Sequence, residues 1–199
     1  MFSLRICTAD GCKNRALYRR DVCREHLEEP SGYDCEIAEI LGGASKLAAM
    51  NVSGVRLHGL DLRGRSIERC ILSGGEFHDL NLSNCRIRLV YLDFSTFQNC
   101  SFQGSKLNTV VFSGSRIVNC NFSGSDIVRC NFCGIDCQET LFDECDLYAS
   151  RFIGSKLNRI GFKDCNLKQV RFEHAEISEA DFRYSNTEDA FFEKRIDNP

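Results

Sequence analysis

The chain has 199 residues, 43% of them hydrophobic, with 25 basic and 28 acidic side chains and a formal net charge of −3. A chain of this size and composition can bury one substantial core, which argues against a disordered protein. No stretch reaches the ~20 apolar residues of a membrane span, and the first residues lack the apolar region of a signal peptide. We therefore expect a cytoplasmic protein that is not inserted in a membrane.

Residues 1–30 contain four side chains that bind metals well. Cys7 and Cys12 form one short-spaced pair, Cys23 and His26 form a second, and a loop separates the two pairs. This donor set suits tetrahedral zinc, and so short a segment cannot bury a core without such a cross-link. Because all four ligands are committed, the pattern predicts one structural zinc ion per chain. The segment resembles small Cys3His zinc-binding modules; the alternative is a metal-free segment whose cysteines only pack.

The same segment is locally basic. Arg15, Arg19, Arg20 and Arg24 form the kind of cluster that contacts phosphate groups. Acidic residues are interleaved with them, and residues 1–43 carry six basic against eight acidic side chains. The pattern favours a solvated surface, so nucleic acid is not the expected partner, and contact with it through the zinc module is kept as an alternative.

Residues 31–46 are interpreted as a linker and an N-terminal cap. The segment from Glu36 to Leu41 predicts a short helix, which Gly42 and Gly43 close. A cap is needed because a repetitive domain follows, and such domains expose backbone at their ends.

The next part of the chain has a strict period of five. From Leu47 to Phe192, every fifth residue is apolar at thirty consecutive positions, with Thr187 as the one exception. The residue two before each of these positions is small or apolar almost throughout, and Arg65 is the clear exception. Neither a helix nor a flat strand has this period. The period predicts a solenoid, in which each unit contacts only its neighbours.

The five-residue unit resembles that of the pentapeptide-repeat family, which reads Ala-(Asp/Asn)-Leu-X-X around a central Leu or Phe. Cys120–Gly124 and Ala180–Tyr184 fit this unit well. The resemblance covers residues 47–199, as a β-helix with a C-terminal cap. It implies an all-β solenoid, namely a right-handed quadrilateral parallel β-helix of about 7.5 coils with four units per coil.

Four sides are also supported by the residues themselves. Every fourth central residue gives two mainly aliphatic rows and two mainly aromatic rows, so we expect like side chains to stack at the inter-strand spacing of ~4.8 Å. In one row, glycines two residues after the centres predict corners with positive φ, as in type II turns. These glycines are Gly54, Gly74, Gly114, Gly134 and Gly154.

Seven of the thirteen cysteines lie in the small inward row, where we interpret them as compact buried hydrophobic residues. Cys100 and Cys120 lie one coil apart, as do Cys145 and Cys165, and this spacing lies within the Cα range of a disulfide. Parallel Cβ directions and the expected intracellular location favour free thiols.

Outward positions give a candidate partner surface. Ile71, Tyr91 and Val111 fall twenty residues apart in one column, and Phe94 lies beside Tyr91. Together they predict an exposed apolar stripe of the kind that marks interaction sites. The alternative is the ordinary scatter of apolar residues on a protein surface.

Four arginines form a candidate basic contact, namely Arg65, Arg69, Arg86 and Arg88. Arg65 occupies a nominally inward position, and an unpaired buried arginine would be too costly. We therefore expect the backbone to bulge at Arg65.

The C-terminal end of the repeat gives a candidate self-association residue. Phe192 belongs to the interior row and Phe191 is expected to point outward. In dimeric relatives of the resembled family the C-terminal coils meet end to end, so the resemblance makes Phe191 a candidate contact of a homodimer. The alternative is that the C-terminal tail covers Phe191.

Catalytic patterns are not found in the sequence. No histidine and carboxylate converge on a serine in a recognisable motif, and His58 and His78, one coil apart, lack a third ligand. We expect a non-enzymatic scaffold that binds an unidentified protein partner.

The alternative is a DNA mimic that modulates a type II topoisomerase (gyrase), as quinolone-resistance relatives of the resembled family do. Mimicry needs a dense negative surface, since duplex DNA carries a charge every ~1.7 Å. Residues 44–115 carry a net charge of +3 and residues 116–199 a net charge of −4. The first half therefore has the wrong sign, and the scaffold is favoured.

Overall fold

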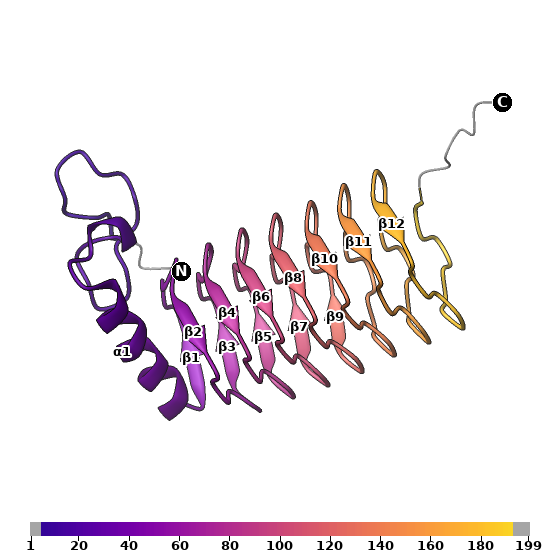
Figure 1. The fold of residues 1–199 in the computed structure, drawn as a ribbon, viewed down its shortest axis with the longest axis horizontal. Coiled ribbons are helices and arrows are strands. Elements are labelled where there is room, and N and C mark those ends of the chain that lie inside the picture. Colours follow the sequence, from indigo (N-terminus) through magenta and orange to yellow (C-terminus); the bar gives the residue numbers. More distant parts are fainter. Residues whose placement is uncertain (1–4, 193–199) are drawn as a thin grey trace.

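The chain forms a rod of stacked coils with a helix and an irregular segment at its N-terminal end (Figure 1). The computed structural model describes residues 5–192. The helices are η1 (Arg24–His26), a short 3-10 turn, and α1 (Pro30–Gly43). Neither described helix is long and apolar enough to cross a membrane. The strands are β1 (Lys46–Ala48), β2 (Arg56–His58), β3 (Ser66–Glu68), β4 (Glu76–His78), β5 (Arg86–Arg88), β6 (Thr96–Gln98), β7 (Lys106–Asn108), β8 (Arg116–Val118), β9 (Asp126–Val128), β10 (Asp136–Gln138), β11 (Lys156–Asn158) and β12 (Glu176–Ser178).

The coils pair with one another in four parallel columns. One sheet has the order β1-β3-β5-β7-β9 and the other the order β12-β11-β10-β8-β6-β4-β2. Partners lie twenty residues apart, as in Leu47 with Ile67 and Leu57 with Phe77. The other two sides are joined by single parallel bridges, such as that between Asp61 and Asn81. The predicted parallel β-solenoid is confirmed, with about seven turns.

The core is a double column of phenylalanine rings. Phe102 stacks on Phe122 with their centroids 4.5 Å apart, and Phe112 stacks on Phe132 at 4.8 Å. Between the columns the rings meet edge to face, as Phe112 and Phe122 do at 6.1 Å. Both geometries suit the quadrupole of an aromatic ring. The predicted stacking of like side chains along the rod is therefore confirmed.

The small inward row links neighbouring coils by hydrogen bonds. Ser115 is buried, and its hydroxyl donates to the Leu92 carbonyl at 2.9 Å and accepts from the Ser95 N–H at 3.0 Å. Cysteines at equivalent positions direct their thiols at carbonyls in the same way, as Cys145 does toward Phe122. All thirteen cysteines are free thiols. The inward row therefore binds adjacent coils together as well as filling space.

Every corner of the rod uses left-handed backbone. Each fifth residue from Ala49 to Asp189 has a positive φ, and most of these residues are not glycine. The positive φ predicted for the glycine corners is confirmed, and the same conformation extends to side chains as large as Phe94, with a φ of 53°. The turn that closes each unit requires this conformation whichever residue occupies it.

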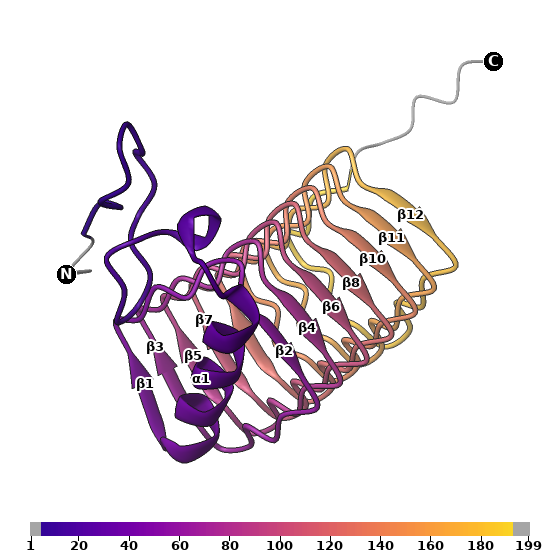
Figure 2. The same ribbon diagram turned by 60° about the vertical axis from the view of Figure 1, so that its left-hand side comes forward.

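Helix α1 covers the N-terminal end of the rod (Figures 1 and 2). Tyr33, Ile37 and Leu41 are buried in the same core as the first coils, so the helix closes the open end of the stack. A helix was expected only over Glu36–Leu41; the observed helix starts at Pro30, whose fixed φ suits the first helical position.

The predicted backbone bulge at Arg65 was wrong. The Arg65 N–H donates to the Leu62 carbonyl at 3.3 Å, as equivalent residues do elsewhere, and the coil stays regular. The side chain leaves the coil at its open end instead, donating to the carbonyls of Ala44 and of Gly42, the latter at 2.6 Å. These carbonyls lie at the C-terminal end of α1, where a helix lacks acceptor partners and a cation is favourable. Arg65 therefore caps α1.

The far end of the rod is less well covered. Phe192 stacks on Phe172 with centroids 4.9 Å apart, yet it is 44% exposed, because the described residues include no further coil beyond it. The sequence predicted an interior position for Phe192, and its partial exposure corrects that prediction. Phe191 is 53% exposed and bridges to Arg171.

Candidate metal centre and contact surface

The N-terminal segment brings four metal-binding side chains together. Cys7, Cys12, Cys23 and His26 each offer one ligand atom, and these atoms all lie within 4.8 Å of one another. The Cys12 and Cys23 sulfurs are 3.8 Å apart, and the His26 Nδ1 lies 3.6 Å from the Cys7 sulfur and 3.3 Å from the Cys23 sulfur. In the described part of the chain, it is the one such cluster found.

These separations fit tetrahedral zinc. Bonds of ~2.3 Å to sulfur and ~2.0 Å to nitrogen at tetrahedral angles place two sulfurs about 3.8 Å apart and a sulfur and a nitrogen about 3.5 Å apart. The three separations given above agree with these values to within a few tenths of an ångström. The donor set could therefore hold one ion with all four positions occupied by protein.

Short backbone contacts position the four ligands. An antiparallel bridge joins Ile6 to Arg15, and the Cys7 N–H donates to the Asn14 carbonyl at 2.8 Å, which closes a loop around Cys12. Cys23 is the N-cap of the single turn η1 and His26 is its last residue, and the His26 N–H donates to the Cys23 carbonyl at 3.1 Å. The loop and the turn thus direct two pairs of ligands toward a common point.

Hydrogen bonds within the cluster also shift the pKa values of its ligands. Burial raises the pKa of the Cys23 thiol, but hydrogen bonds from His26 and from the Glu25 N–H outweigh it and lower that pKa to about 6. The same contact with Cys23, followed by that with Cys7, raises the pKa of His26. The lowered pKa favours the thiolate form of Cys23, which is the form that binds metals.

The candidate partner surface is smaller than the sequence indicated. Tyr91 is 44% exposed and Phe94 73% exposed, while Val111 is half-buried. Ile71 is only 8% exposed, so its assignment to an exposed stripe was wrong. Its column begins at Asn51, which is covered by the N-terminal segment, and Ile71 lies between Asn51 and Tyr91.

Phe94 is the most exposed apolar side chain of this surface. Its ring lies over the corner of the next coil, where a Cβ added to Gly114 would come within 2.7 Å of it. The other corners of its column from Gly54 to Gly154 are glycines, so Phe94 alone among them projects a side chain.

The four arginines of the candidate basic contact do not form one surface. Arg65 is engaged with α1, as described above. Arg69, Arg86 and Arg88 are exposed, on β5 and the corner after β3. They present positive charge on a different side of the rod from Phe94.

The two stacked histidines form a surface pair. The rings of His58 and His78 are 6.4 Å apart, and the His58 Nε2 lies 3.1 Å from an Asp79 oxygen. Among the described residues they do not belong to a cluster able to hold a metal. This agrees with the absence of a third ligand noted in the sequence.

Ion pairs between neighbouring coils were missed in the sequence. Residues of opposite charge face each other across one coil, with separations from 2.9 to 3.4 Å. The pairs are Arg56–Glu76, Lys106–Asp126, Arg116–Asp136, Arg159 with both Glu139 and Glu179, and Lys168–Glu188. Opposite charges twenty residues apart are the signal that could have found them. Each exposed pair contributes about 0–1 kcal/mol.

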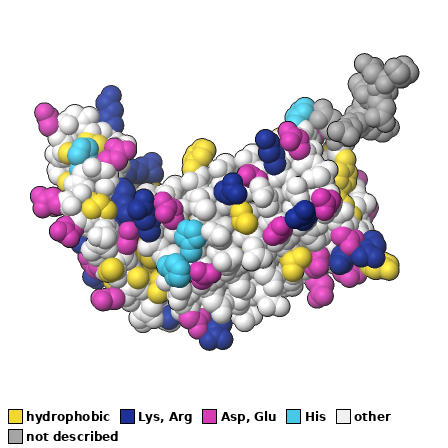
Figure 3. Space-filling view, viewed as in Figure 1, with side chains coloured by type: hydrophobic (Ala, Val, Ile, Leu, Met, Phe, Trp, Pro, Cys, Tyr) yellow, Lys and Arg dark blue, Asp and Glu magenta, His cyan; other side chains and the backbone are white. Residues whose placement is uncertain are grey.

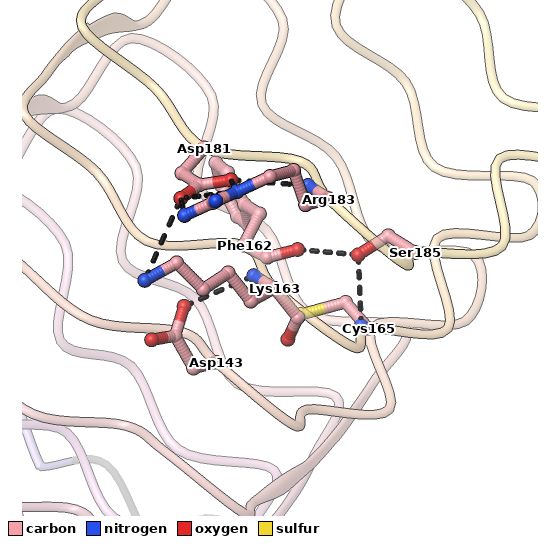
Figure 4. A network of polar contacts seen from close by, with 7 residues as sticks. All are labelled: Asp143, Phe162, Lys163, Cys165, Asp181, Arg183 and Ser185. Atoms are coloured by element: carbon pink, nitrogen blue, oxygen red, sulfur yellow. Dashed lines mark hydrogen bonds and ion pairs between the residues drawn. The ribbon is translucent and has the colours of Figure 1, made fainter.

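The last coils carry a denser polar network (Figure 4). Asp181 accepts from the Arg183 guanidinium at 2.7 Å and pairs with Lys163 at 3.5 Å. Hydrogen bonds from Arg183 hold the pKa of Asp181 well below its usual range. The Lys163 N–H donates to Asp143 at 3.0 Å, and Ser185 accepts from the Cys165 N–H at 2.8 Å. The network ties three successive coils together near the C-terminal end.

Two family models match the chain. The model of a pentapeptide repeat region matches residues 125–195, and the model of pentapeptide repeats in eight copies matches residues 85–124 and 95–134. Together they span more than half of the chain, and neither includes the Cys7–His26 cluster. No curated protein matches the chain.

Several solved structures are similar to parts of the chain. A pentapeptide-repeat protein from the thylakoid lumen of Arabidopsis thaliana has a TM-score of 0.47 and 18% identity, covering 48% of this chain and 67% of that protein. HetL, a protein from the cyanobacterium Nostoc that is involved in heterocyst differentiation regulation, has a TM-score of 0.35 and 13% identity, covering 78% and 92% of the two chains. QnrB1, a plasmid-mediated fluoroquinolone resistance protein in trypsin-treated form, has a TM-score of 0.38 and 17% identity, covering 71% and 88%.

Proposed function

This chain belongs to the pentapeptide-repeat family, and from that premise we propose that it is a non-enzymatic scaffold that binds another protein. The observation that carries the proposal is Phe94, an aromatic side chain that is 73% exposed on left-handed backbone. Tyr91 and Val111 lie next to it and widen the apolar surface. We call Tyr91, Phe94 and Val111 the aromatic surface.

Stability alone does not account for a phenylalanine at this corner. A bulky residue with positive φ is strained, and an exposed ring gains little from burial. Glycine avoids the strain and occupies the corners of the coils immediately before and after, at Gly74 and Gly114. Non-glycine residues occupy most corners of the rod, so the left-handed backbone alone does not distinguish Phe94. Its distinguishing property is a wholly apolar ring that is 73% exposed, and exposed apolar side chains concentrate at binding sites.

We further infer that the Cys7–His26 cluster binds one structural zinc ion, which fixes the N-terminal module against the rod. Arg24, inside η1, donates to both carboxylate oxygens of Asp34 in α1, at 2.6 and 2.8 Å. The Tyr18 N–H donates to the Asn51 carbonyl in the first coil at 2.6 Å. An ion that orders η1 would thereby hold the module to both α1 and the rod.

A DNA mimic acting on a type II topoisomerase such as gyrase has less support. Acidic side chains in the second half of the rod, such as Asp126, Asp136 and Glu139, are paired with basic residues of neighbouring coils. Such pairing dilutes the uniform negative field that imitation of DNA needs.

Affinity capture from the lysate of the source cells tests the scaffold. We expect the Tyr91→Ser/Phe94→Gly double variant to lose partners that the wild type retains. Leu141→Ser is the matched control, because Leu141 is as exposed as Tyr91 but lies in another column. An unchanged set of partners with the double variant would refute the aromatic surface as the contact.

A further inference from the structure

A groove separates the N-terminal module from the first coils of the rod. Its volume is about 430 Å³. Lys13, Arg15 and Glu25 line it on the side of the module, and Ser53 and Gly54 line it on the side of the rod. Figure 3 shows Lys and Arg side chains gathered where the module meets the rod, beside a hollow in the surface. We call this feature the module–rod groove.

Two cations in the module–rod groove are uncompensated. Arg24 also lines it, but its charge is neutralised by Asp34. Glu25 is held by the Asn14 side-chain amide at 3.0 Å. Lys13 and Arg15 are exposed, and within residues 5–192 neither makes an ion pair. The groove therefore presents two free positive charges against one carboxylate, which favours an anionic group as its occupant.

The groove opens onto the same face of the rod as the aromatic surface. Gly54 in its wall is the first corner of the column that continues through Gly74 to Phe94. A Cβ added at Gly54 would meet the Arg24 side chain at 2.9 Å, whereas one added at Gly74 would meet no atom within 4 Å. The path toward Phe94 is therefore open from the edge of Arg24 onward. At ~4.8 Å per coil, Gly54 and Phe94 are about 10 Å apart, which an extended peptide spans with about three residues.

We propose that one extended acidic segment of a partner protein occupies this face. Its carboxylate would lie in the module–rod groove with Lys13 and Arg15, and an apolar side chain about three residues away would pack on Phe94 and Tyr91. This proposal rests on the scaffold function and specifies the chemistry of the partner.

A nucleic acid suits the face less well than a peptide does. Asp93 lies beside Phe94, where its carboxylate accepts from the Ser73 hydroxyl at 2.6 Å. A nucleic acid carries a negative charge at every nucleotide, so its phosphates would be repelled by the Asp93 carboxylate as well as by Glu25. A peptide can place its negative charge at one end only.

The test uses the full-length, zinc-loaded protein and a displayed library of random peptides about ten residues long, enough to cover the groove and both coils. The selected peptide with the highest affinity is then titrated by fluorescence anisotropy. We expect an enriched Asp or Glu about three residues from an aromatic or aliphatic residue. We also expect the Lys13→Glu/Arg15→Glu variant to bind that peptide about tenfold more weakly, as two lost surface ion pairs imply.

The control is Arg86→Glu/Arg88→Glu, which makes the same change in charge on exposed residues of β5. Equal losses from both double variants would mean that net charge alone drives binding and would overturn the proposal. So would selected peptides without acidic residues, or no selected peptide at all.

Two further results separate the alternatives. If Tyr91→Ser/Phe94→Gly abolishes peptide binding while Lys13→Glu/Arg15→Glu does not, the scaffold stands and the acidic segment is wrong. Binding of a duplex DNA or single-stranded RNA probe that depends on Lys13 and Arg15, without binding of acidic peptides, would also overturn the proposal. Zinc content and circular dichroism of each variant establish that the module remains folded.

Discussion

The serine hydroxyls of the inward row are predicted to contribute substantially to stability, in proportion to the hydrogen bonds they make. Ser115→Ala would remove the partner of two buried backbone groups, the Leu92 carbonyl and the Ser95 N–H. Each unsatisfied buried group costs about 1–3 kcal/mol, so the free energy of unfolding should fall by about 2–6 kcal/mol. The methyl group of alanine fills nearly the same space, so little of this loss is packing.

Two matched variants calibrate the effect. Ser155 is equally buried in the same row, but its hydroxyl makes one hydrogen bond, to the Phe132 carbonyl at 2.7 Å. Ser155→Ala should therefore cost about half as much, or about 1–3 kcal/mol. Ser123 points outward at a corner, and Ser123→Ala should change stability by no more than ~0.5 kcal/mol.

Urea denaturation followed by circular dichroism measures the three free energies, and hydrogen exchange measures the protection of the Ser95 amide directly. We expect the order Ser115→Ala, Ser155→Ala, Ser123→Ala, and faster exchange at Ser95 only in the first variant. Equal costs for Ser115→Ala and Ser123→Ala would refute the reasoning, because the inward hydroxyls would then be doing no more than filling space.

Four further outcomes are expected. Purified protein should contain about one zinc ion per chain by metal analysis, and Cys23→Ser should lose it; a metal-free but ordered module would contradict the site. Folding favours the Cys23 thiolate, so its stabilisation is present above the ordinary thiol pKa and lost as pH falls through about 6. Because protons and zinc compete for the same thiolates, zinc release followed with a chromogenic chelator should rise as the pH falls, and release independent of pH between 5 and 8 would contradict the assignment. Arg65→Ala should lower the free energy of unfolding by about 1 kcal/mol because it uncaps α1, as measured by thermal unfolding. An unchanged unfolding temperature would show that the contact of Arg65 with α1 does not contribute to stability. If the C-terminal coils meet in a homodimer, Phe191→Ser should weaken it in sedimentation velocity, and a concentration-independent monomer in the wild type would exclude that dimer.

The period of five was sufficient to predict the rod because the interior depends only on register. An insertion or deletion anywhere between Leu47 and Phe192 would have moved every later side chain out of its column, and there is none. The stacked phenylalanines and the glycine corners followed from the same register. The Cys7–His26 ligand set could be recognised for a similar reason, since two short-spaced pairs need only a local loop and turn to converge.

Features that depend on contact between the module and the rod could not be predicted in this way. Ile71 looked exposed because the register places it outward, but Asn51, one coil before it, lies beneath the N-terminal segment and hydrogen bonds to Ala16. Arg65 looked misplaced because the register gives it no partner, whereas the end of α1 supplies one. A repeat pattern specifies how coils meet one another and carries no information about how a non-repetitive segment docks on them.

Because each coil contains twenty residues, the number of residues between two points of the rod determines both their distance along its axis and their relative rotation about it. Adding or removing a full coil would slide everything beyond it along the axis without turning it, whereas adding one five-residue unit would rotate everything beyond it by a quarter turn. The alignment of Phe94 with Gly54 depends on this count, since the two lie forty residues, or two whole coils, apart. A single extra unit between them would move the ring to an adjacent side while leaving the interior packed. In this protein the spacing along the chain therefore encodes the angle at which separate parts of the surface face a common partner.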